Sequence, residues 1–296
     1  MSVPQFVDLV FKLPINRQFT YEVPSNVRAP IGARATAPFG DRSLTGVIVS
    51  KRNSPPPGVT PRSLVRVIDQ DPVADQTVIG IARWVADTYI CSLGEALAAI
   101  LPAGRRESLL QDSVPPIKSG QYGLTSAQRS ALAGVMGEMS GVSYLFGVTG
   151  SGKTAVFLNA TRKTLEEGRS VIYLVPEIGL TVQWLQRFED RFGAEPLSWH
   201  SDLGVARRRL TWRAVAQGRA RVVVGARSAL FLPYADLGLI IVDEEHDSAF
   251  KQEDGLIYHG RDMAVLRASL GEIPIILVSA TPSLESLVNL DAGRYS

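Results

Sequence analysis

Short runs of alternating apolar and polar residues dominate the first hundred positions of the chain. Apolar Val7, Leu9 and Phe11 alternate with residues that include polar Asp8 and Lys12. This period of two is typical of β-strands, and here the runs end at Pro or Gly. Further strands are predicted at 19–23, 33–37 and 44–50, and helices at 78–85 and on to 101. We therefore expect a small β-rich, barrel-like domain covered by helices over residues 1–104.

The pattern changes after residue 124, where continuous apolar runs alternate with helical spacing. Strands are predicted at 142–146, 171–175, 196–199, 222–224, 239–242 and 275–278. Continuous apolar runs suit the strands of a parallel sheet that is buried on both faces. The pattern predicts an α/β fold, with a RecA-like parallel-sheet lobe over 124–296 and a linker over 105–123.

One run in this second part matches the phosphate-binding pattern G-x-x-x-x-G-K-[ST] without a gap. It consists of Gly147, Val148, Thr149, Gly150, Ser151, Gly152, Lys153 and Thr154. A predicted strand precedes it and a helical stretch at 155–165 follows, which is the context that a P-loop requires. Glycines let backbone N–H groups curl around an anion, and the helix N-terminus adds its positive dipole end. Lys153 is expected to reach the terminal phosphates of a nucleoside triphosphate and Thr154 to sit on Mg²⁺, which by itself leaves kinases, transporters, GTPases and motors open. The alternative, a glycine-rich turn that happens to carry a lysine, is disfavoured by this context.

A second signal is the apolar strand that ends in Asp243, Glu244, Glu245 and His246. Asp243 is placed to hold Mg²⁺, and Glu244 to orient and deprotonate an attacking water. Solvated acids at a strand end are the alternative, which the Asp-Glu-x-His order behind a P-loop disfavours. Ser279 and Thr281 follow another buried strand, and we expect them to couple the Glu244 and His246 end of the site to movements on hydrolysis. The three signals in this order have the layout of superfamily 2 helicases.

Composition and charge limit the classes of partner that we expect this protein to bind. The 296 residues are 45% hydrophobic and 20% charged, as in a globular protein with an ample core, and no apolar run reaches membrane-spanning length. The N-terminus lacks the layout of a signal peptide, so a cytoplasmic protein without a membrane partner is expected. The formal net charge is +2, but residues 1–66 carry nine Lys or Arg against three Asp or Glu, which is +6. A basic first segment indicates a polyanionic partner.

Four stretches of the second part, 174–181, 200–201, 225–231 and 243–248, resemble the PriA family of bacterial replication-restart helicases. The resemblance implies an ATP-dependent 3′–5′ DNA helicase that acts on forked and single-stranded DNA, with ATP and Mg²⁺ as cofactors. It also implies that Gln128 reads adenine, although an ordinary exposed helix residue is an equal alternative without the family. Single-strand binding protein and primosome proteins are the implied protein partners.

The same resemblance implies a DNA track beside the ATP site. Aromatic side chains and His259 are expected to stack on bases, and basic side chains to reach phosphates. The implied contacts are Arg227, Ser228, Phe250, Lys251, Tyr258, His259 and Arg261. Residues 207–209, a run of three arginines, are instead interpreted as a solvated helix face.

The first domain resembles the family's domain for binding a 3′ DNA end, with Phe19, Tyr21, Gly40 and Arg62 at the pocket positions. Aromatics suit stacking on a terminal base, glycine close backbone approach, and arginine a phosphate. Alternation places Phe19 and Tyr21 on one face, and the sequence leaves open whether that face is the core or the pocket.

Three departures from the family accompany the resemblance. Thr20 stands where the family usually has an acid, and the linker is too short for the family's winged-helix domain. A second RecA lobe and the cysteine-rich zinc insertion are not found in these 296 residues, and Cys91 is the only cysteine. We therefore expect a fragment or a shortened relative, weakly active by itself. A fork-binding module without motor activity and another DNA translocase are the competing hypotheses, and the first domain argues against the latter.

Overall fold

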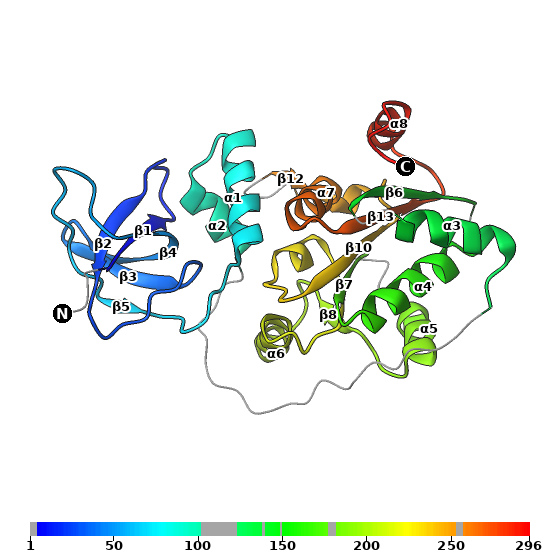
Figure 1. The fold of residues 1–296 in the computed structure, drawn as a ribbon, viewed down its shortest axis with the longest axis horizontal. Helices are drawn as coiled ribbons and strands as arrows, with labels where there is room; N and C mark the ends of the chain where they lie inside the picture. The colour runs from blue at the N-terminus through cyan, green and yellow to red at the C-terminus, as the bar shows by residue number, and fades with distance from the viewer. Residues whose placement is uncertain (1–4, 102–122, 138–139, 149, 177–181, 253–256) are drawn as a thin grey trace. The chain divides into compact units, whose positions relative to one another are not determined.

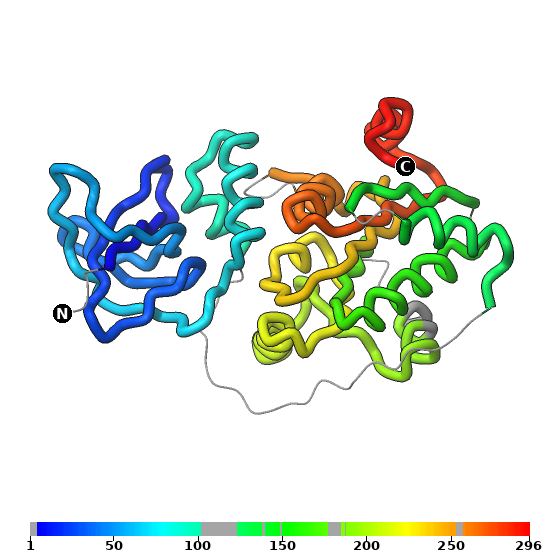
Figure 2. The backbone as a smooth tube through the Cα atoms, viewed as in Figure 1, coloured from blue at the N-terminus to red at the C-terminus, as the bar shows by residue number. Residues whose placement is uncertain are grey.

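The structure is a computed structural model, and it describes residues 5–101, 123–137, 140–148, 150–176, 182–252 and 257–296. Thr149, residues 177–181 and most of the predicted linker lie outside this description. The chain forms two compact units, Met1–Glu107 and Ser108–Ser296. Figures 1 and 2 show the elements and the path of the backbone in each unit.

The first unit is built on a curled antiparallel sheet of five strands in the order β2-β1-β4-β3-β5 (Figure 1). The strands are β1 (Gln5–Phe11), β2 (Phe19–Val23), β3 (Arg34–Phe39), β4 (Arg42–Arg52) and β5 (Arg66–Val67). Strand β2 lies at one edge of the sheet, and on its outer side the Glu22 N–H donates to the Arg62 carbonyl and the Glu22 carbonyl accepts from the Leu64 N–H, each at 3.0 Å.

Alternate residues of these strands form the core of the first unit. Val7, Leu9, Phe11, Tyr21 and Ile48 belong to one buried cluster, as the alternation in the sequence predicts. Helices α1 (Gln76–Thr88) and α2 (Leu93–Ile100) complete the unit. Helix α2 approaches β1 so closely that a Cβ at Gly94 would lie 1.7 Å from the Phe11 carbonyl oxygen, which explains the glycine at this position.

The second unit contains a parallel sheet of six strands in the order β6-β13-β10-β7-β9-β8. The strands are β6 (Gly141–Phe146), β7 (Ser170–Leu174), β8 (Leu197–Trp199), β9 (Val222–Gly225), β10 (Leu237–Asp243) and β13 (Pro274–Ser279). Every residue of β7 and β9 is buried. The predicted α/β lobe and its six strands are confirmed, because runs buried on both faces have a strong sequence signature.

Helices cover both faces of this sheet (Figure 1). These helices are α3 (Ser126–Gly137), α4 (Lys153–Glu166), α5 (Val182–Phe192), α6 (Val205–Ala216) and α7 (Gly260–Gly271), whereas α8 (Leu284–Asp291) projects away from the sheet. Apolar residues of α3, α4 and α5 share one core cluster with alternate residues of the central strands, Tyr173 and Ile241 among them. The intervening strand residues face the opposite side. A short 3-10 turn, η2 (Arg227–Phe231), follows β9, and a second 3-10 turn and a small hairpin lie between β10 and α7.

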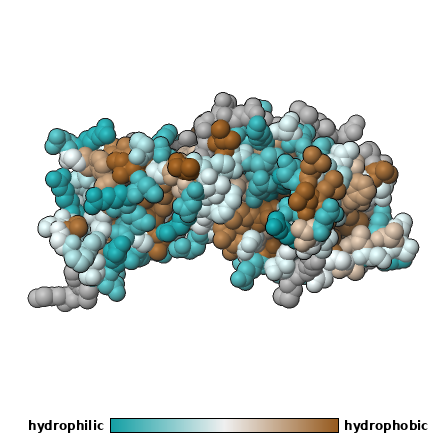
Figure 3. All heavy atoms as spheres, turned by 90° about the horizontal axis from the view of Figure 1, so that it is seen from above, coloured by the Kyte–Doolittle hydropathy of each residue, from teal (hydrophilic) through white to brown (hydrophobic). Residues whose placement is uncertain are grey.

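The hairpin joins β11 (Lys251–Gln252) and β12 (Tyr258–His259), and η3 (Ser248–Phe250) leads into it. In the described part of the chain, no helix combines the length and the apolar character needed to cross a membrane. Polar and apolar residues are interspersed on the face of the molecule that Figure 3 draws.

Candidate nucleotide site and nucleic-acid interface

The loop between β6 and α4 has the backbone of a phosphate-binding loop. Gly150 and Gly152 have φ values of 84° and 86°, a left-handed conformation that residues with a Cβ rarely adopt. Gly152 is also the N-cap of α4, so the helix begins at Lys153 with its N-terminal N–H groups directed toward the loop. The Lys153 ammonium donates to the Gly147 carbonyl and, at 3.2 Å, to the Val148 carbonyl. The loop therefore presents glycines, a helix N-terminus and a lysine in one place.

A cavity of about 630 Å³ lies against this loop. Gly150, Gly152, Lys153 and Thr154 line it together with Asp243 and Glu244, which lie some ninety positions later in the chain. The structure thus brings the two sequence signals to one cavity, because β10 ends at the same edge of the parallel sheet as β6. The remaining lining residues were not predicted and come from α4 and α5: Ala155, Phe157, Leu158, Asp190 and Arg191. No pattern in the sequence marked them, since they lie on ordinary helix faces.

Asp243 and Glu244 differ sharply in environment. Burial raises the pKa of Asp243 to about 6, and the neighbouring Glu244 carboxylate adds to the shift, while the Glu244 N–H at 3.1 Å and Lys153 oppose it. Glu244 has a φ of 49°, unusual for a residue with a side chain, and its side chain is 45% exposed. Backbone strain of this kind costs about 1–3 kcal/mol and is concentrated at functional sites. The half-buried Asp243 and the strained Glu244 both line the cavity.

His246 connects this strand end to the one that follows β13. Its Nδ1 lies 2.8 Å from the Ser279 Oγ, and its Nε2 lies 3.2 Å from the Thr281 Oγ1. The same Nδ1 is 3.6 Å from a Glu244 carboxylate oxygen. The predicted coupling residues Ser279 and Thr281 therefore contact His246, which in turn lies beside Glu244.

Gln128 lies against the phosphate loop and also caps its own helix. Its Oε1 accepts from the Thr125 N–H at 3.0 Å, and its N–H donates to the Thr125 Oγ1 at 3.2 Å, which is a capping box for α3. A Cβ at Gly152 would lie 2.3 Å from the Gln128 Nε2, so the glycine admits the amide. Helix capping accounts for the Gln128 carbonyl oxygen, and the amide nitrogen is the group that faces the loop.

The residues of the predicted DNA track have unequal exposure. Ser228 and Lys251 are exposed, whereas Phe250 is 1% exposed and Arg261 is 6% exposed. Arg227 donates to the Lys251 carbonyl, which ties η2 to the hairpin. Tyr258 packs edge-on against Phe231 with ring centroids 5.6 Å apart. Phe250 and Arg261 are therefore buried in this arrangement, and the exposed side chains of the set include those of Ser228 and Lys251.

His259 is half-buried at the end of the hairpin. Burial lowers its pKa, and the adjacent Arg261 guanidinium lowers it further, although Asp262 and Glu245 oppose the shift. The imidazole is therefore neutral at pH 7, which suits stacking on a base better than an ionic contact with a phosphate.

Arg261 belongs to a buried network centred on Glu245. The Glu245 carboxylate is 0% exposed and accepts from Arg261 at 3.1 Å, Tyr144 at 2.8 Å and the Ser283 N–H at 2.9 Å. Ser283 and Ser286 donate their hydroxyls to it as well, each at 3.0 Å. Burial alone would raise the pKa of Glu245, but these hydrogen bonds hold it below its usual value. Nothing in the sequence predicts the burial of Glu245, since an acid inside a run of acids carries no signal of burial.

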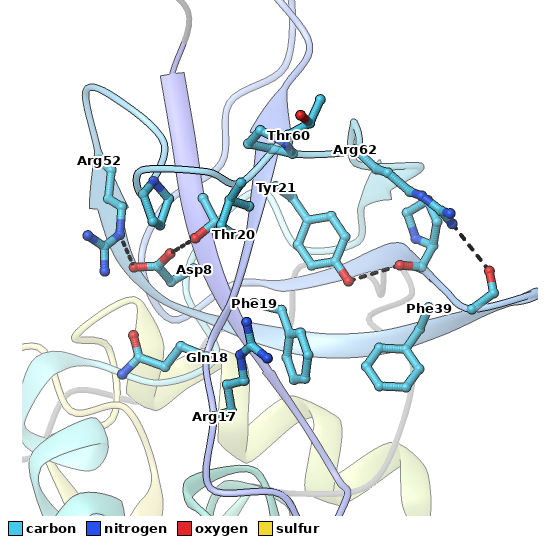
Figure 4. A pocket seen from close by; sticks show the side chains of 15 residues that line it. Asp8, Arg17, Gln18, Phe19, Thr20, Tyr21, Phe39, Arg52, Thr60 and Arg62 are labelled. Carbon is cyan, nitrogen blue, oxygen red and sulfur yellow. Dashed lines mark hydrogen bonds and ion pairs between the residues drawn. The ribbon is translucent and has the colours of Figure 1, made fainter.

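The first unit contains a separate cavity of about 570 Å³, and all four residues predicted for the 3′-end pocket line it (Figure 4). Phe19 and Tyr21 come from β2, Gly40 from the turn after β3, and Arg62 from the segment before β5. Arg62 donates to the Gly40 carbonyl at 3.2 Å, which joins two of these segments.

Phe19 and Tyr21 share one face, and that face serves both the core and the cavity. Tyr21 is only 5% exposed, and its hydroxyl donates to the Pro38 carbonyl at 2.9 Å. Phe19 is half-buried, with its ring centroid 5.2 Å from that of Phe39. Phe39 is therefore a cavity aromatic that was not among the predicted site residues.

The cavity also holds a charged cluster that the sequence analysis missed. Asp8 lies on β1 opposite Thr20, and its carboxylate accepts from the Thr20 hydroxyl at 2.7 Å and the Arg52 Nε at 2.7 Å. The side chain of Asp8 is 1% exposed. Asp8 had been interpreted only as the polar half of an alternating strand, and an acid at such a position normally points to solvent.

Within the described ranges, no group of three or more His, Cys, Asp or Glu side chains is placed to hold a metal ion. Thr154 and Asp243 together on the nucleotide cavity do fit Mg²⁺, which is bound through one or two protein oxygens and the phosphates of a substrate.

Comparison with known proteins finds two family matches. Residues 8–102 match the 3′ DNA-binding domain (3′BD) of PriA, and residues 125–290 match the DEAD/DEAH box helicase family. The replication restart protein PriA of Treponema pallidum is 41% identical over 292 residues, which is 95% of this chain and 44% of that protein.

Two further relatives carry the same name. PriA of Bacillus subtilis is 43% identical over 176 residues, covering 58% of this chain and 22% of that protein. PriA of Haemophilus influenzae is 30% identical over 372 residues, covering 98% of this chain and 51% of that protein. That alignment is longer than the chain itself, so the Haemophilus protein holds residues with no counterpart here. The chain spans about half the length, or less, of the relatives that it matches.

Proposed function

Because the chain belongs to the PriA family of replication restart proteins, we propose that it is the end-binding and nucleotide-binding part of an ATP-dependent DNA helicase. In this proposal the first unit recognises the 3′ end of the leading strand at a fork, and the second unit is the first lobe of the motor. The observation that carries the proposal is that residues far apart in sequence converge on two cavities, one with the P-loop and Asp243–Glu244, the other with Phe19, Tyr21, Gly40 and Arg62.

In the nucleotide cavity, each group has a distinct task. The loop glycines and Lys153 hold the phosphates, and Thr154 and Asp243 hold Mg²⁺, which supplies charge neutralisation of the phosphates when bound. Glu244, which lines the cavity and has a side chain 45% exposed, takes the proton of the attacking water. A change in the position or charge of Glu244 reaches Ser279 and Thr281 through His246, because the two ring nitrogens of His246 are within hydrogen-bond distance of their hydroxyls.

For the whole protein we infer a 3′–5′ polarity, cytoplasmic location, and contacts with single-strand binding protein and primosome proteins, all on the strength of the family. We also infer that residues 1–296 bind ATP but hydrolyse it slowly by themselves. Two-lobed motors cleave ATP between their lobes, and PriA of Treponema pallidum is more than twice as long as its matched part.

The test is a pair of DNA forks that differ at one group. One fork has a leading strand ending in a 3′-hydroxyl at the branch, and the other carries a 3′-phosphate on that end. Fluorescence anisotropy at fixed salt should show about tenfold weaker binding of the phosphate-ended fork, because the added phosphate group needs space beyond the terminal sugar that a 3′-hydroxyl end does not need. Equal affinity for both forks would show that the first unit is a basic DNA-binding surface and nothing more.

Hydrolysis separates the motor from a fork-binding module without motor activity. ATPase rates are compared with and without forked DNA, for residues 1–296 and for a longer natural version of the chain. DNA-stimulated hydrolysis in the longer version supports the motor. Tight nucleotide binding without any stimulated hydrolysis in either version would favour the module.

A further inference from the structure

The Asp8 cluster in the 3′-end cavity is built from three neighbouring strands. Asp8 on β1 faces Thr20 across β2 and Ser50 across β4 in the strand register. Both hydroxyls donate to its carboxylate, Thr20 at 2.7 Å and Ser50 at 2.5 Å. Burial alone would raise the pKa of Asp8, but these hydrogen bonds and Arg52 bring it below its usual value. Asp8 is therefore a fixed negative charge inside the sheet.

Arg52 is anchored by this charge at only one of its three nitrogens. Its Nε donates to Asp8 at 2.7 Å, and the side chain is 47% exposed although that of Asp8 is 1% exposed. Within the described residues, the two terminal nitrogens of Arg52 make no hydrogen bond. Figure 4 shows the guanidinium at one end of the cavity, with Asp8 and Thr20 beside it and Phe39 and Arg62 at the other end.

This geometry is suited to an anion with two oxygens. A guanidinium fixed through Nε cannot rotate freely, so its terminal N–H groups keep one orientation and lose little entropy on binding. A phosphate accepts such a pair of parallel N–H donors. The cavity as a whole carries three arginines, Arg17, Arg52 and Arg62, against one carboxylate, which favours an anionic ligand.

We propose that Arg52 is a preorganised contact for one backbone phosphate of the strand whose 3′ end enters the cavity, and that Asp8 positions it. The inference rests on the proposed end-binding function and deepens it, because it assigns a residue and a ligand group to the far end of the same cavity. Phe19 and Tyr21 line the same cavity as Arg52 and Arg62, so a strand bound along that cavity can contact both arginines.

The experiment locates the phosphate by removing single charges from both partners. Single-stranded DNA ending in a 3′-hydroxyl is prepared with one neutral methylphosphonate at the last, second-last or third-last linkage. Its binding is measured by anisotropy for the wild-type chain, Arg52→Gln and Arg28→Gln. Arg28 is an exposed arginine of the same unit outside the cavity, so its substitution removes the same charge elsewhere.

At one of the three linkages, the neutral group should weaken wild-type and Arg28→Gln binding about tenfold and leave Arg52→Gln binding unchanged. The slope of log K against log salt should fall by about 0.7 in Arg52→Gln, as for the loss of one phosphate contact to a single strand. If Arg52→Gln keeps the wild-type sensitivity at every linkage, Arg52 does not bind a phosphate and the inference is wrong.

Two further measurements distinguish a failure of the Arg52 inference from a failure of end binding or of folding. If the wild-type chain binds a 3′-hydroxyl end no better than a 3′-phosphate end, the end-binding function itself fails, whatever Arg52 does. If Arg52→Gln does not fold because Asp8 is left buried without its cation, the double variant Asp8→Asn with Arg52→Gln removes both charges and takes its place. The double variant must also lose the linkage sensitivity.

Discussion

Replacing Arg261 by leucine should destabilise the helicase lobe without directly removing a DNA contact. The Arg261 side chain is 7% exposed and Glu245 is 0% exposed, so the substitution leaves a buried carboxylate without its cation. Breaking a buried ion pair costs about 3–5 kcal/mol. Tyr144, Ser283 and Ser286 still donate to Glu245, which places the expected loss at about 3 kcal/mol, the lower end of that range.

For a unit of this size, such a loss lowers Tm by about 6–12 °C. Differential scanning calorimetry of the whole chain measures it, and the lobe's transition is identified as the one that an ATP analogue raises. Arg207→Leu is the matched control, because Arg207 is an exposed arginine on α6 of the same lobe. It should move Tm by little, as is usual for surface substitutions.

A double variant tests whether the uncompensated charge on Glu245 causes the loss of stability. Adding Glu245→Gln to Arg261→Leu removes the uncompensated charge, so the double variant should lose less stability than the two single variants combined. The reasoning is refuted if Arg261→Leu melts like Arg207→Leu and yet binds single-stranded DNA more weakly at low temperature. Arg261 would then be a strand contact after all.

Three further outcomes are expected at the nucleotide cavity. Lys153→Ala should abolish binding of a fluorescent ATP analogue and leave the fork affinity of the first unit intact, and equal loss of both would contradict two separate sites. Glu244→Gln should keep nucleotide binding and lose hydrolysis in the longer version by about 10²–10⁴-fold, the contribution of a general base, as phosphate release would show. Because burial raises the pKa of Asp243 to about 6 and Mg²⁺ needs the ionised carboxylate, magnesium-dependent nucleotide binding should strengthen as pH rises through about 6 and level off above it. Asp243→Asn should lack that step, and a step that persists would come from the nucleotide itself.

The sequence by itself determined the features that depend on local order. Period-two alternation and continuous apolar runs predicted the main strands of both sheets, because a strand's side-chain directions follow directly from its position in the chain. The phosphate loop was equally local. Its strand, glycines and helix N-terminus lie within about twenty residues, and Gly150 and Gly152 do adopt the left-handed backbone that the pattern requires.

Only the tertiary structure decided which polar and aromatic side chains are accessible. Arg261 and Glu245 are 16 positions apart, and both are buried because α7, α8 and β6 meet around them. The sequence left open whether Phe19 and Tyr21 face the core or a pocket. In the structure this face contributes to both the core and the cavity, because β2 is an edge strand and both residues line the cavity. In the sequence, Asp8 is an ordinary polar residue of a strand. In the structure, Thr20, Ser50 and Arg52 from two neighbouring strands donate hydrogen bonds to its carboxylate. Burial and charge pairing arise from residues distant in the chain, and hydrophobic spacing carries no information about which of those residues will meet.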